Sequence, residues 1–390
     1  MSTRREFLQC AALIGAAASL PVDLALGQEN VTKKVDPLFS VGNRNILNVK
    51  RKPRKITIPD VGKFRVLKGD FHIHTLFSDG LVMPRDRVSE AVENGLDVIS
   101  LTEHIEYRPF FGGKSTQLNT QLKDRNDDHN FAFDLAKPEA DKNNLILIRG
   151  TEITKNRMPP GHFNAIFLKD VNAVAAVVDD WKKMLAVAAD QGAFVFWNHP
   201  GWVAPKSGGL EKGVPMSFTS EHDEVRRKGH LHGIEIFNGT SYYPIVADWC
   251  NEMDMGLLSN SDIHKSEWNM YGNQNPLRPM TLILATDRTE AAIREAFFAH
   301  RTIGWAAGMI LGKPKLVEQL FNACVEIKKS NNSIELTNLS DIPCKIQIAN
   351  NSQELKPQNK LELTTNPTTK KLIVENWLIG TNKPLEVAIG

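Results

Sequence analysis

Residues 69–80 constrain the fold of this chain more than any other stretch. They read Gly-Asp-Phe-His-Ile-His-Thr-Leu-Phe-Ser-Asp-Gly. Side chains alternate between the two faces of a strand, so a strand here sends His72 and His74 out of one face and their apolar neighbours into the core. The Ser-Asp-Gly turn that follows could bring Asp79 back toward the two histidines. Two imidazoles and a carboxylate suit Zn, Mn or Fe, whereas the simpler alternative is a strand with surface histidines.

Short apolar runs alternate with helical patterns downstream of this stretch. Residues 84–95 predict a helix, with a proline near its start and a glycine at its end, and residues 97–101 predict the next strand. Further buried strands are predicted at residues 145–148, 162–167, 193–196, 233–237 and 256–259, with helical patterns at 174–190 and 243–253 between some of them. This alternation predicts an α/β fold with a parallel sheet that is closed or nearly closed.

Metal-capable residues recur where these strands end. The motifs are Thr-Glu-His, Gly-Thr-Glu, Asn-His-Pro and Ser-Asp-Ile-His, and they contain His104, Glu152, His199, Asp262 and His264. A further histidine, His162, opens a strand instead of closing one. In a βα barrel the carboxyl ends of the strands form the catalytic face, so these side chains are expected to converge. Each of them alone is better explained as a capping or surface residue, but their recurrence argues against independent accidents.

In this order the motifs resemble those of the PHP family (polymerase and histidinol phosphatase type), a branch of the metal-dependent amidohydrolase-like barrels. The likeness covers residues 56–308 and includes Asp-Phe-His-Ile-His-Thr with Ser-Asp-Gly at its start. It implies a distorted seven-stranded (β/α) barrel of PHP type. It also implies a cofactor of two to three divalent metal ions, which we expect to be Mn, Zn or Fe.

The resemblance divides nine residues among these metals. One metal would be held by His72, His74, Glu152 and Asp262. The second would be surrounded by Asp79, His104 and His264. The third would be held by Glu152 together with His162 and His199. Which metals Glu152 bridges stays open at the level of sequence.

The charge of such a site favours a phosphate ester as substrate. Three divalent ions outweigh three carboxylates and one shared hydroxide, and the remaining positive charge suits a phosphoryl group that gains negative charge as the nucleophile adds. Asp262 and His264 are the candidate catalytic residues, because they could ligate a metal or carry protons. Arg108, Arg157 and Lys265 are candidate phosphate contacts, or else ordinary surface charges.

The predicted activity is therefore that of a metal-dependent hydrolase of small-molecule phosphate esters, with a phosphodiesterase favoured. A phosphomonoesterase is the first alternative, and a non-catalytic metal-containing binding protein is the second. Apolar and charged residues make up 42% and 24% of the chain, as in an ordinary globular protein. A net charge of +2 gives no reason to expect a nucleic-acid partner, and the sequence says nothing about oligomeric state.

Residues 1–27 resemble a twin-arginine export signal, which predicts a periplasmic location. Arg4 and Arg5 precede the apolar run 11–20, and small residues allow cleavage before Gln28. A membrane anchor is the weaker alternative because the run is too short to span a bilayer, and no other stretch is long and apolar enough. Residues 28–55 form a basic stretch that we interpret as a linker, with a nucleic-acid patch as the alternative.

The remaining chain is predicted as a barrel domain over residues 56–312 and a small all-β, sandwich-like domain over 313–390. The second range shows period-two runs separated by polar turns, and no catalytic cluster. Of the cysteines that follow the signal, Cys324 and Cys344 could pair across two late strands. Two stretches, 107–144 and 201–228, interrupt the barrel pattern at ligand-bearing ends and are candidate substrate loops.

Overall fold

The computed structural model describes residues 53–108, 128–155, 160–202, 216–271, 277–365 and 369–389. The predicted export signal, most of the predicted linker and Arg157 lie outside these residues. The chain divides into one unit that ends at Lys52 and a second unit over Pro53–Gly390. The described helices of the second unit include none that is long and apolar enough to cross a membrane.

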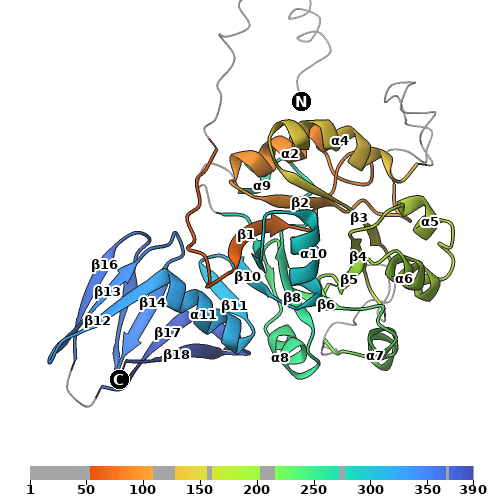
Figure 1. Cartoon of the computed structure of the whole chain (residues 1–390). Coiled ribbons are helices and arrows are strands. Elements are labelled where there is room, and N and C mark those ends of the chain that lie inside the picture. The colour runs from red at the N-terminus through yellow and green to blue at the C-terminus, as the bar shows by residue number, and fades with distance from the viewer. Residues whose placement is uncertain are drawn as a thin grey trace, which may run out of the picture. The chain divides into compact units, whose positions relative to one another are not determined.

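A large mixed sheet carries the predicted ligands (Figure 1). The predicted ligands lie in or next to β1 (Arg65–Asp70), β2 (Val98–Leu101), β3 (Ile146–Ile153), β4 (Phe163–Ile166), β5 (Phe194–Trp197) and β8 (Gly256–Asn260). Strand β6 (Gly233–Asn238) carries no predicted ligand and pairs with both β5 and β8. The neighbours β1, β2 and β3 run parallel, as do β5, β6 and β8. Strand β4 is antiparallel to both β3 and β5. The expectation of a parallel sheet was therefore wrong for β4, because the connection from β3 to β4 is too short for a helical crossover.

The last and first of these strands approach each other beyond their carboxyl ends. Ile73 and Ile263 form a parallel bridge, and the backbone N–H of His74 donates to the carbonyl of Ile263 at 3.2 Å. Strand β9 (Met280–Ala285) is antiparallel to β1, and β10 (Thr302–Ala306) is antiparallel to β9. Two further strands of the same sheet are β7 (Ser241–Tyr242) and β11 (Met309–Gly312). The segments that follow β1 and β8 therefore lie side by side.

Helices follow most of the ligand-bearing strands. Figure 1 shows α2 (Pro84–Glu93) beside α4 (Phe131–Lys142), and the other helices around the sheet are α5 (Val171–Ala175), α6 (Trp181–Asp190), α7 (Ser220–Arg227), α8 (Ile245–Glu252), α9 (Glu267–Tyr271) and α10 (Glu290–Phe298). Pro84 opens α2 as predicted. The single helix expected over 174–190 is instead two helices, because the Asp180 side chain accepts hydrogen bonds from two backbone N–H groups and so starts α6 as a new helix.

Aromatic rings fill the interior next to the ligand-bearing strands. The ring of Phe297 on α10 meets the rings of Phe71, Phe194 and Phe167 edge-on, at centroid distances of 4.8, 5.1 and 5.6 Å. Phe71, Phe194 and Phe297 are fully buried. Because Phe71 directly precedes His72, this packing holds the backbone that presents the first ligand pair.

The range predicted as all-β begins with a helix, α11 (Pro314–Cys324). Its buried Val317, Leu320, Phe321 and Cys324 recur at the helical spacing, which the expectation of period two overlooked. The strands that follow are β12 (Val325–Lys329), β13 (Ser333–Asn338), β14 (Cys344–Ile348), β15 (Asn351–Leu355), β16 (Lys360–Thr364), β17 (Lys371–Gly380) and β18 (Lys383–Ala388).

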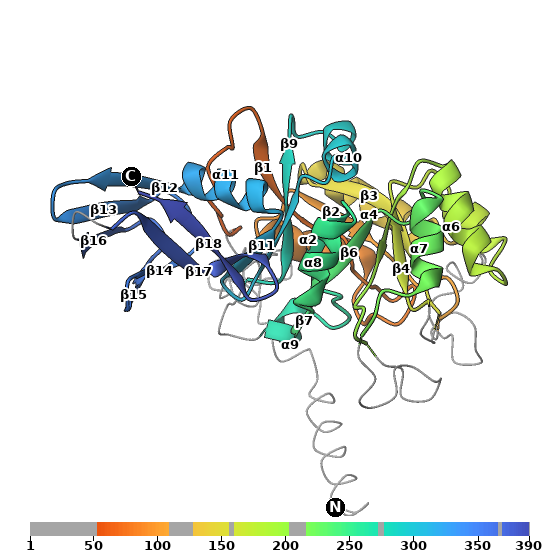
Figure 2. The same ribbon diagram turned by 90° about the horizontal axis from the view of Figure 1, so that it is seen from below.

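These strands form two sheets that share one core with α11 (Figure 2). Strands β12, β13 and β16 form the smaller sheet. Strands β14, β15, β17 and β18 belong to the large sheet, because β17 pairs in parallel with β11. Trp377 on β17 is fully buried and meets Phe321 of α11 at 5.6 Å. Cys324 and Cys344 are buried free thiols, so the disulfide considered from the sequence does not form in this structure.

Candidate metal centre

The strand ends bring the nine predicted ligands to one edge of the sheet. His72 and His74 follow β1, His104 follows β2, and Asp262 and His264 follow β8. The remaining positions are Glu152 in β3, His162 before β4 and His199 after β5, with Asp79 in the turn beyond β1. In the register of β3 and β4, Phe163 lies opposite Ile153. The start of β4 therefore meets the end of β3, which explains why His162 precedes its strand while the other ligands follow theirs.

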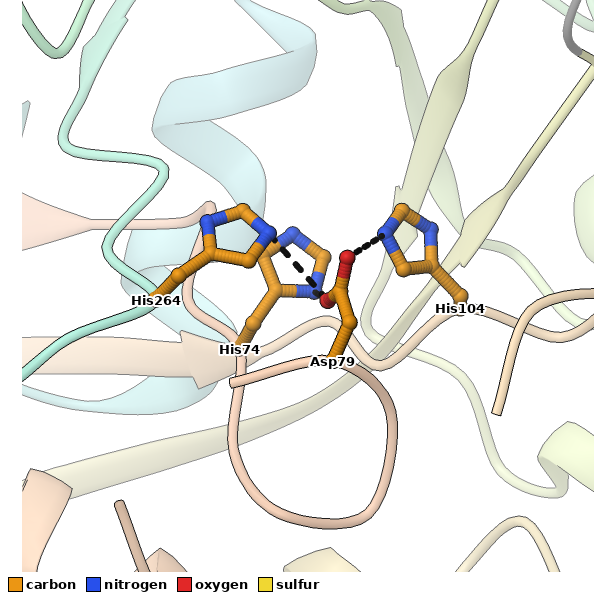
Figure 3. Close-up of side chains that lie close together, drawn as sticks. All are labelled: His74, Asp79, His104 and His264. Atoms are coloured by element: carbon orange, nitrogen blue, oxygen red, sulfur yellow. Dashed lines mark ion pairs between the residues drawn. The ribbon is translucent and has the colours of Figure 1, made fainter. Parts of the chain in front are cut away.

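Four side chains form the group drawn in Figure 3: His74, Asp79, His104 and His264. Each offers a ligand atom within 4.8 Å of those of the others. Asp79 lies between two histidines, with Oδ1 3.1 Å from His264 Nε2 and Oδ2 3.4 Å from His104 Nε2. The His74 ring stacks on those of His264 and His104 at 4.3 and 4.5 Å. One cation could therefore contact all four side chains.

Glu152 is the centre of the remaining contacts. Its fully buried carboxylate lies 3.0–3.6 Å from ring nitrogens of five histidines: His72, His74, His104, His162 and His199. Two further groups with the same ligand spacing are His72, Glu152 and His199, and His72, His74 and Asp262. His74 and His72 each belong to two groups, which differs from the predicted division, where each served one metal. His162 belongs to no such group, but its Nδ1 lies 3.0 Å from Glu152.

Two histidines of this cluster, His72 and His74, have a raised pKa. Burial lowers the pKa of His72, but the carboxylates of Asp262, Glu235 and Glu152 outweigh burial and hold this pKa well above the ordinary value. Burial likewise opposes the charged form of His74, yet Asp262 and Glu152 raise its pKa to about 10. The buried carboxylates thus attract positive charge to the positions where a cation would bind.

The carboxylates remain ionised for the reciprocal reason. Burial alone would raise the pKa of Asp79, but His104 and His264 hold it well below the ordinary value. Burial is also outweighed at Glu152, where His104 and His72 are the main causes of a lowered pKa, and at Asp262, where His72 and His74 have this effect.

A cavity of about 260 Å³ opens onto the cluster. Its lining consists of Asp79, His104, Tyr107, Glu152, Thr154, His162, His199, Trp202, Asp262 and His264. None of these described lining residues is a lysine or an arginine. Of the predicted phosphate contacts, Lys265 is exposed, and Arg108 donates through Nε to the carbonyl of Phe77 at 2.9 Å. Neither Lys265 nor Arg108 is among the described residues that line the cavity.

A crystal structure of a protein from Bacteroides vulgatus resembles this chain over most of its length. That protein is described as a two-domain protein containing a predicted PHP-like metal-dependent phosphoesterase. The two share 34% sequence identity and superpose with a TM-score of 0.76, covering 87% of this chain and 98% of the other. This chain belongs to the family of PHP-like metal-dependent phosphoesterases.

Two further solved structures are less similar to this chain. A proposed metal-dependent phosphoesterase from Bifidobacterium adolescentis has 17% identity and a TM-score of 0.36, covering 54% of this chain and 90% of the other. PsfC from Pseudomonas syringae has 13% identity and a TM-score of 0.38, covering 62% and 92%. No family model and no curated protein matches the sequence significantly.

The residues of this PHP-like site fit divalent metals. Within the described residues, His74 Nε2, Asp79 Oδ1 and Asp262 Oδ1 are buried and make no hydrogen bond of acceptable geometry. His74 Nε2 nevertheless lies 3.2 Å from Asp262 Oδ1. Buried polar atoms without partners are rare because leaving them unsatisfied costs free energy. His74 belongs to one ligand group with Asp79 and to another with Asp262, so cations in these two groups would satisfy the three atoms. The mixture of imidazole and carboxylate is one that Zn, Mn and Fe accept.

Sequence reasoning missed Glu235, which holds the first histidine of the PHP-like site. This fully buried residue accepts a contact from His72 Nδ1 at 3.0 Å and a hydrogen bond from the His199 backbone N–H at 2.9 Å. Asn260 and Asn238 donate to the same carboxylate, each at 2.9 Å. A carboxylate behind a ligand histidine orients the ring and increases its basicity. The available signal was a single acidic residue in the apolar run Gly-Ile-Glu-Ile-Phe.

Two buried arginines hold the backbone of the site, and both were missed. Arg87 on α2 donates to the carbonyls of His74, Ile263 and Lys265 at 2.9, 3.1 and 2.9 Å. It therefore ties together the segments that follow β1 and β8. Arg278 pairs with Asp70 at the end of β1, and both side chains are fully buried. Arg87 also pairs with Glu90 three positions later, but its carbonyl partners Ile263 and Lys265 lie 176 and 178 positions away, and Asp70 lies 208 positions from Arg278. Local sequence patterns therefore did not reveal either role.

Proposed function

We propose that this protein hydrolyses phosphate esters with two to three bound divalent metals, Mn, Zn or Fe, and that it prefers phosphodiesters. The observation that carries the proposal is the convergence of five histidines on the buried carboxylate of Glu152 at the floor of a cavity. Membership of the PHP-like family supports the same reaction class. A phosphomonoesterase of the same family remains the alternative in the assay below.

The ligands would divide around Glu152. One cation would contact His74, Asp79, His104 and His264, and Glu152 would face the others with His72, Asp262, His162 and His199. When bound, divalent metals supply Lewis acidity toward phosphoryl oxygens and lower the pKa of a coordinated water. The chain itself holds the substrate's reacting end at the cavity floor and contributes proton transfer.

Asp262 and His264 would move protons at the open side of the cluster. Their side chains are 19% and 35% exposed, whereas those of His72, His74 and Glu152 are fully buried. Asp262 Oδ1 lies 3.5 Å from His264 Nδ1. Asp262 is thus placed to accept a proton from the attacking water, and His264 to pass it toward solvent.

The described cavity wall supports a diester over a monoester. A monoester dianion carries one more negative charge than a diester, and no lysine or arginine of the described lining is present to balance it. A diester also has a second organic group, which the cavity of about 260 Å³ has room to accept.

The decisive assay compares bis(p-nitrophenyl) phosphate with p-nitrophenyl phosphate. Protein stripped with a chelator should be inactive, and reloading with Mn, Zn or Fe should restore faster hydrolysis of the diester. Elemental analysis should find two to three metal equivalents. The His72→Ala/His74→Ala variant should lose metal and activity, while His300→Ala, a histidine outside the cluster, should keep both. Full activity of the metal-free double variant would refute the proposal.

We also propose that residues 1–27 direct export to the periplasm by the twin-arginine route. The support is the sequence alone, with Arg4 and Arg5 ahead of the apolar run. Replacing both by lysine should leave unprocessed protein in the cytoplasm, as detected by fractionation and immunoblotting. Unchanged processing and export of this variant would contradict the assignment.

A further inference from the structure

Two aromatic side chains stand exposed beside the metal-capable cluster. Trp202 is 40% exposed and Tyr107 is 49% exposed, and both line the cavity that opens onto the ligands. Large apolar side chains are ordinarily buried, so exposed ones that share a cavity indicate a surface that a ligand covers. The other described large apolar side chains with comparable exposure, such as Trp268 and Leu81, do not line this cavity.

The two rings flank different ligands. The ring of Trp202 lies 4.8 Å from that of His162 and 5.4 Å from that of His199. The Trp202 backbone N–H donates to the His199 carbonyl at 2.8 Å, so one turn fixes both residues. The ring of Tyr107 lies 5.9 Å from that of His104. The rings of His104 and His162 are themselves 6.1 Å apart, which leaves Tyr107 and Trp202 beside neighbouring parts of the cavity floor.

The other residues that line the cavity supply the groups that bind metal, so Trp202 and Tyr107 are not needed for metal or phosphate binding. Imidazoles and carboxylates make up most of it, and these are the groups that a cation would engage. Apart from Thr154, the lining offers only Trp202 and Tyr107 to the organic part of a substrate. An ester with methyl or ethyl groups would leave both ring faces in contact with water. An aromatic or heteroaromatic ring would cover them, and stacking between aromatic rings favours such binding.

We propose that Trp202 and Tyr107 are specificity-determining residues that receive a planar, unsaturated ring of the substrate. This inference rests on the proposed function and names its substrate class: phosphate esters in which at least one organic group carries an aromatic or heteroaromatic ring. The phosphoryl group lies at the cluster around Glu152, and the ring lies against Trp202 and Tyr107. Neither residue takes part in the chemical step.

Binding of two non-hydrolysable phosphonates to the metal-loaded protein tests the inference without requiring turnover. Phenylphosphonate and methylphosphonate present the same anionic head and differ in the ring. We expect isothermal titration calorimetry to show at least tenfold tighter binding of phenylphosphonate. Trp202→Ala should reduce this preference to about threefold or less, Trp202→Phe should retain most of it, and affinity for methylphosphonate should be unchanged in both variants.

Two further variants complete the comparison. Tyr107→Phe keeps the ring and should behave like the wild type, whereas Tyr107→Ala should lose part of the preference. Trp268→Ala removes an exposed tryptophan that does not line the cavity and should change neither affinity.

Equal affinity of the wild type for both phosphonates would overturn the inference and leave the proposed function intact. Tight binding of phenylphosphonate that survives in both alanine variants would also overturn it, because the ring would then lie elsewhere. Failure of both phosphonates to bind metal-loaded protein would overturn the inference, whereas hydrolysis of bis(p-nitrophenyl) phosphate decides the proposed function separately. The wild-type comparison is decisive even if an alanine variant fails to fold.

Discussion

The buried ion pair between Asp70 and Arg278 is expected to position the metal ligands, and breaking it should weaken both stability and metal binding. Asp70 Oδ1 accepts the backbone N–H of Ser261 at 3.1 Å and that of His72 at 3.3 Å. Its Oδ2 accepts the Ser261 hydroxyl at 2.5 Å and Arg278 Nε at 2.9 Å. One carboxylate thus holds the first histidine after β1 and the residue that precedes Asp262.

Arg278→Met removes the cation while keeping most of the side-chain length. At a separation of 2.9 Å and an effective dielectric constant of 20, the lost attraction is about 6 kcal/mol before the desolvation penalty is counted. Removing one partner of a buried pair typically destabilises a protein by about 3–5 kcal/mol, because the other charge stays buried without compensation. We expect a loss of this size in the free energy of unfolding, together with about tenfold weaker metal binding.

A double-mutant cycle in urea at pH 7 measures the coupling. Asp70→Asn should also destabilise the protein, and the double variant Asp70→Asn/Arg278→Met should be more stable than the sum of the single effects predicts, by at least about 2 kcal/mol. Arg227→Met is the matched control, since Arg227 is 74% exposed in its ion pair with Asp223 and such pairs contribute at most about 1 kcal/mol. A coupling near zero with unchanged metal affinity would refute the reasoning.

Three further predictions concern two of the ligands, the carboxylate behind a third, and a histidine outside the cluster. Both Asp262→Ala and His264→Ala should lower turnover at least about a hundredfold. Excess metal should restore the turnover of His264→Ala better than that of Asp262→Ala, because Asp262 Oδ1 lies 3.2 Å from both His72 and His74 and His264 does not contact them as closely. The reverse order of rescue in a metal titration would contradict this division of the ligands. Glu235→Gln should weaken metal binding about 10–100-fold in calorimetry by removing the carboxylate behind His72, and an unchanged affinity would remove Glu235 from that role. Burial lowers the pKa of His222 from 6.5 to about 4. The free energy of unfolding should therefore be independent of this residue's protonation above pH 6.5 and should fall by about 3 kcal/mol in total as the pH drops toward 4, because the unfolded chain takes up the proton first. Urea unfolding at pH 7 and 4.5 should show a smaller pH dependence in His222→Gln than in the wild type, and an identical dependence would refute this.

Local periodicity was enough to place His72 and His74 on one side of the chain, although β1 ends at Asp70 and only Ile73 between them forms an isolated bridge. The alternation in Phe-His-Ile-His predicts two histidines on one face, and His72 and His74 do share contacts with Glu152 and Asp262. The helix predicted after Pro84 forms as α2. These features depend on neighbours within a few positions, where side-chain direction follows directly from the repeat of the backbone.

Periodicity predicted the wrong element where two patterns compete over a short range. The apolar residues of α11 repeat at helical spacing, yet the polar and apolar runs around them favoured strands. The direction of β4 was also not anticipated, although the short connection from β3 excludes a parallel crossover. That direction is what brings His162 to the same edge as Glu152.

Only the tertiary structure decided which residues support the ligands. Asp70 and Arg278 are 208 positions apart, and Glu235 meets His72 across 163 positions. A buried charge needs a partner of opposite charge or several hydrogen bonds, but that requirement does not say which residue supplies them. The sequence therefore determined the chemical types and local faces of the ligands, while their supports, the shared position of His74 and the cavity wall of Trp202 and Tyr107 depend on how distant strands pair and pack.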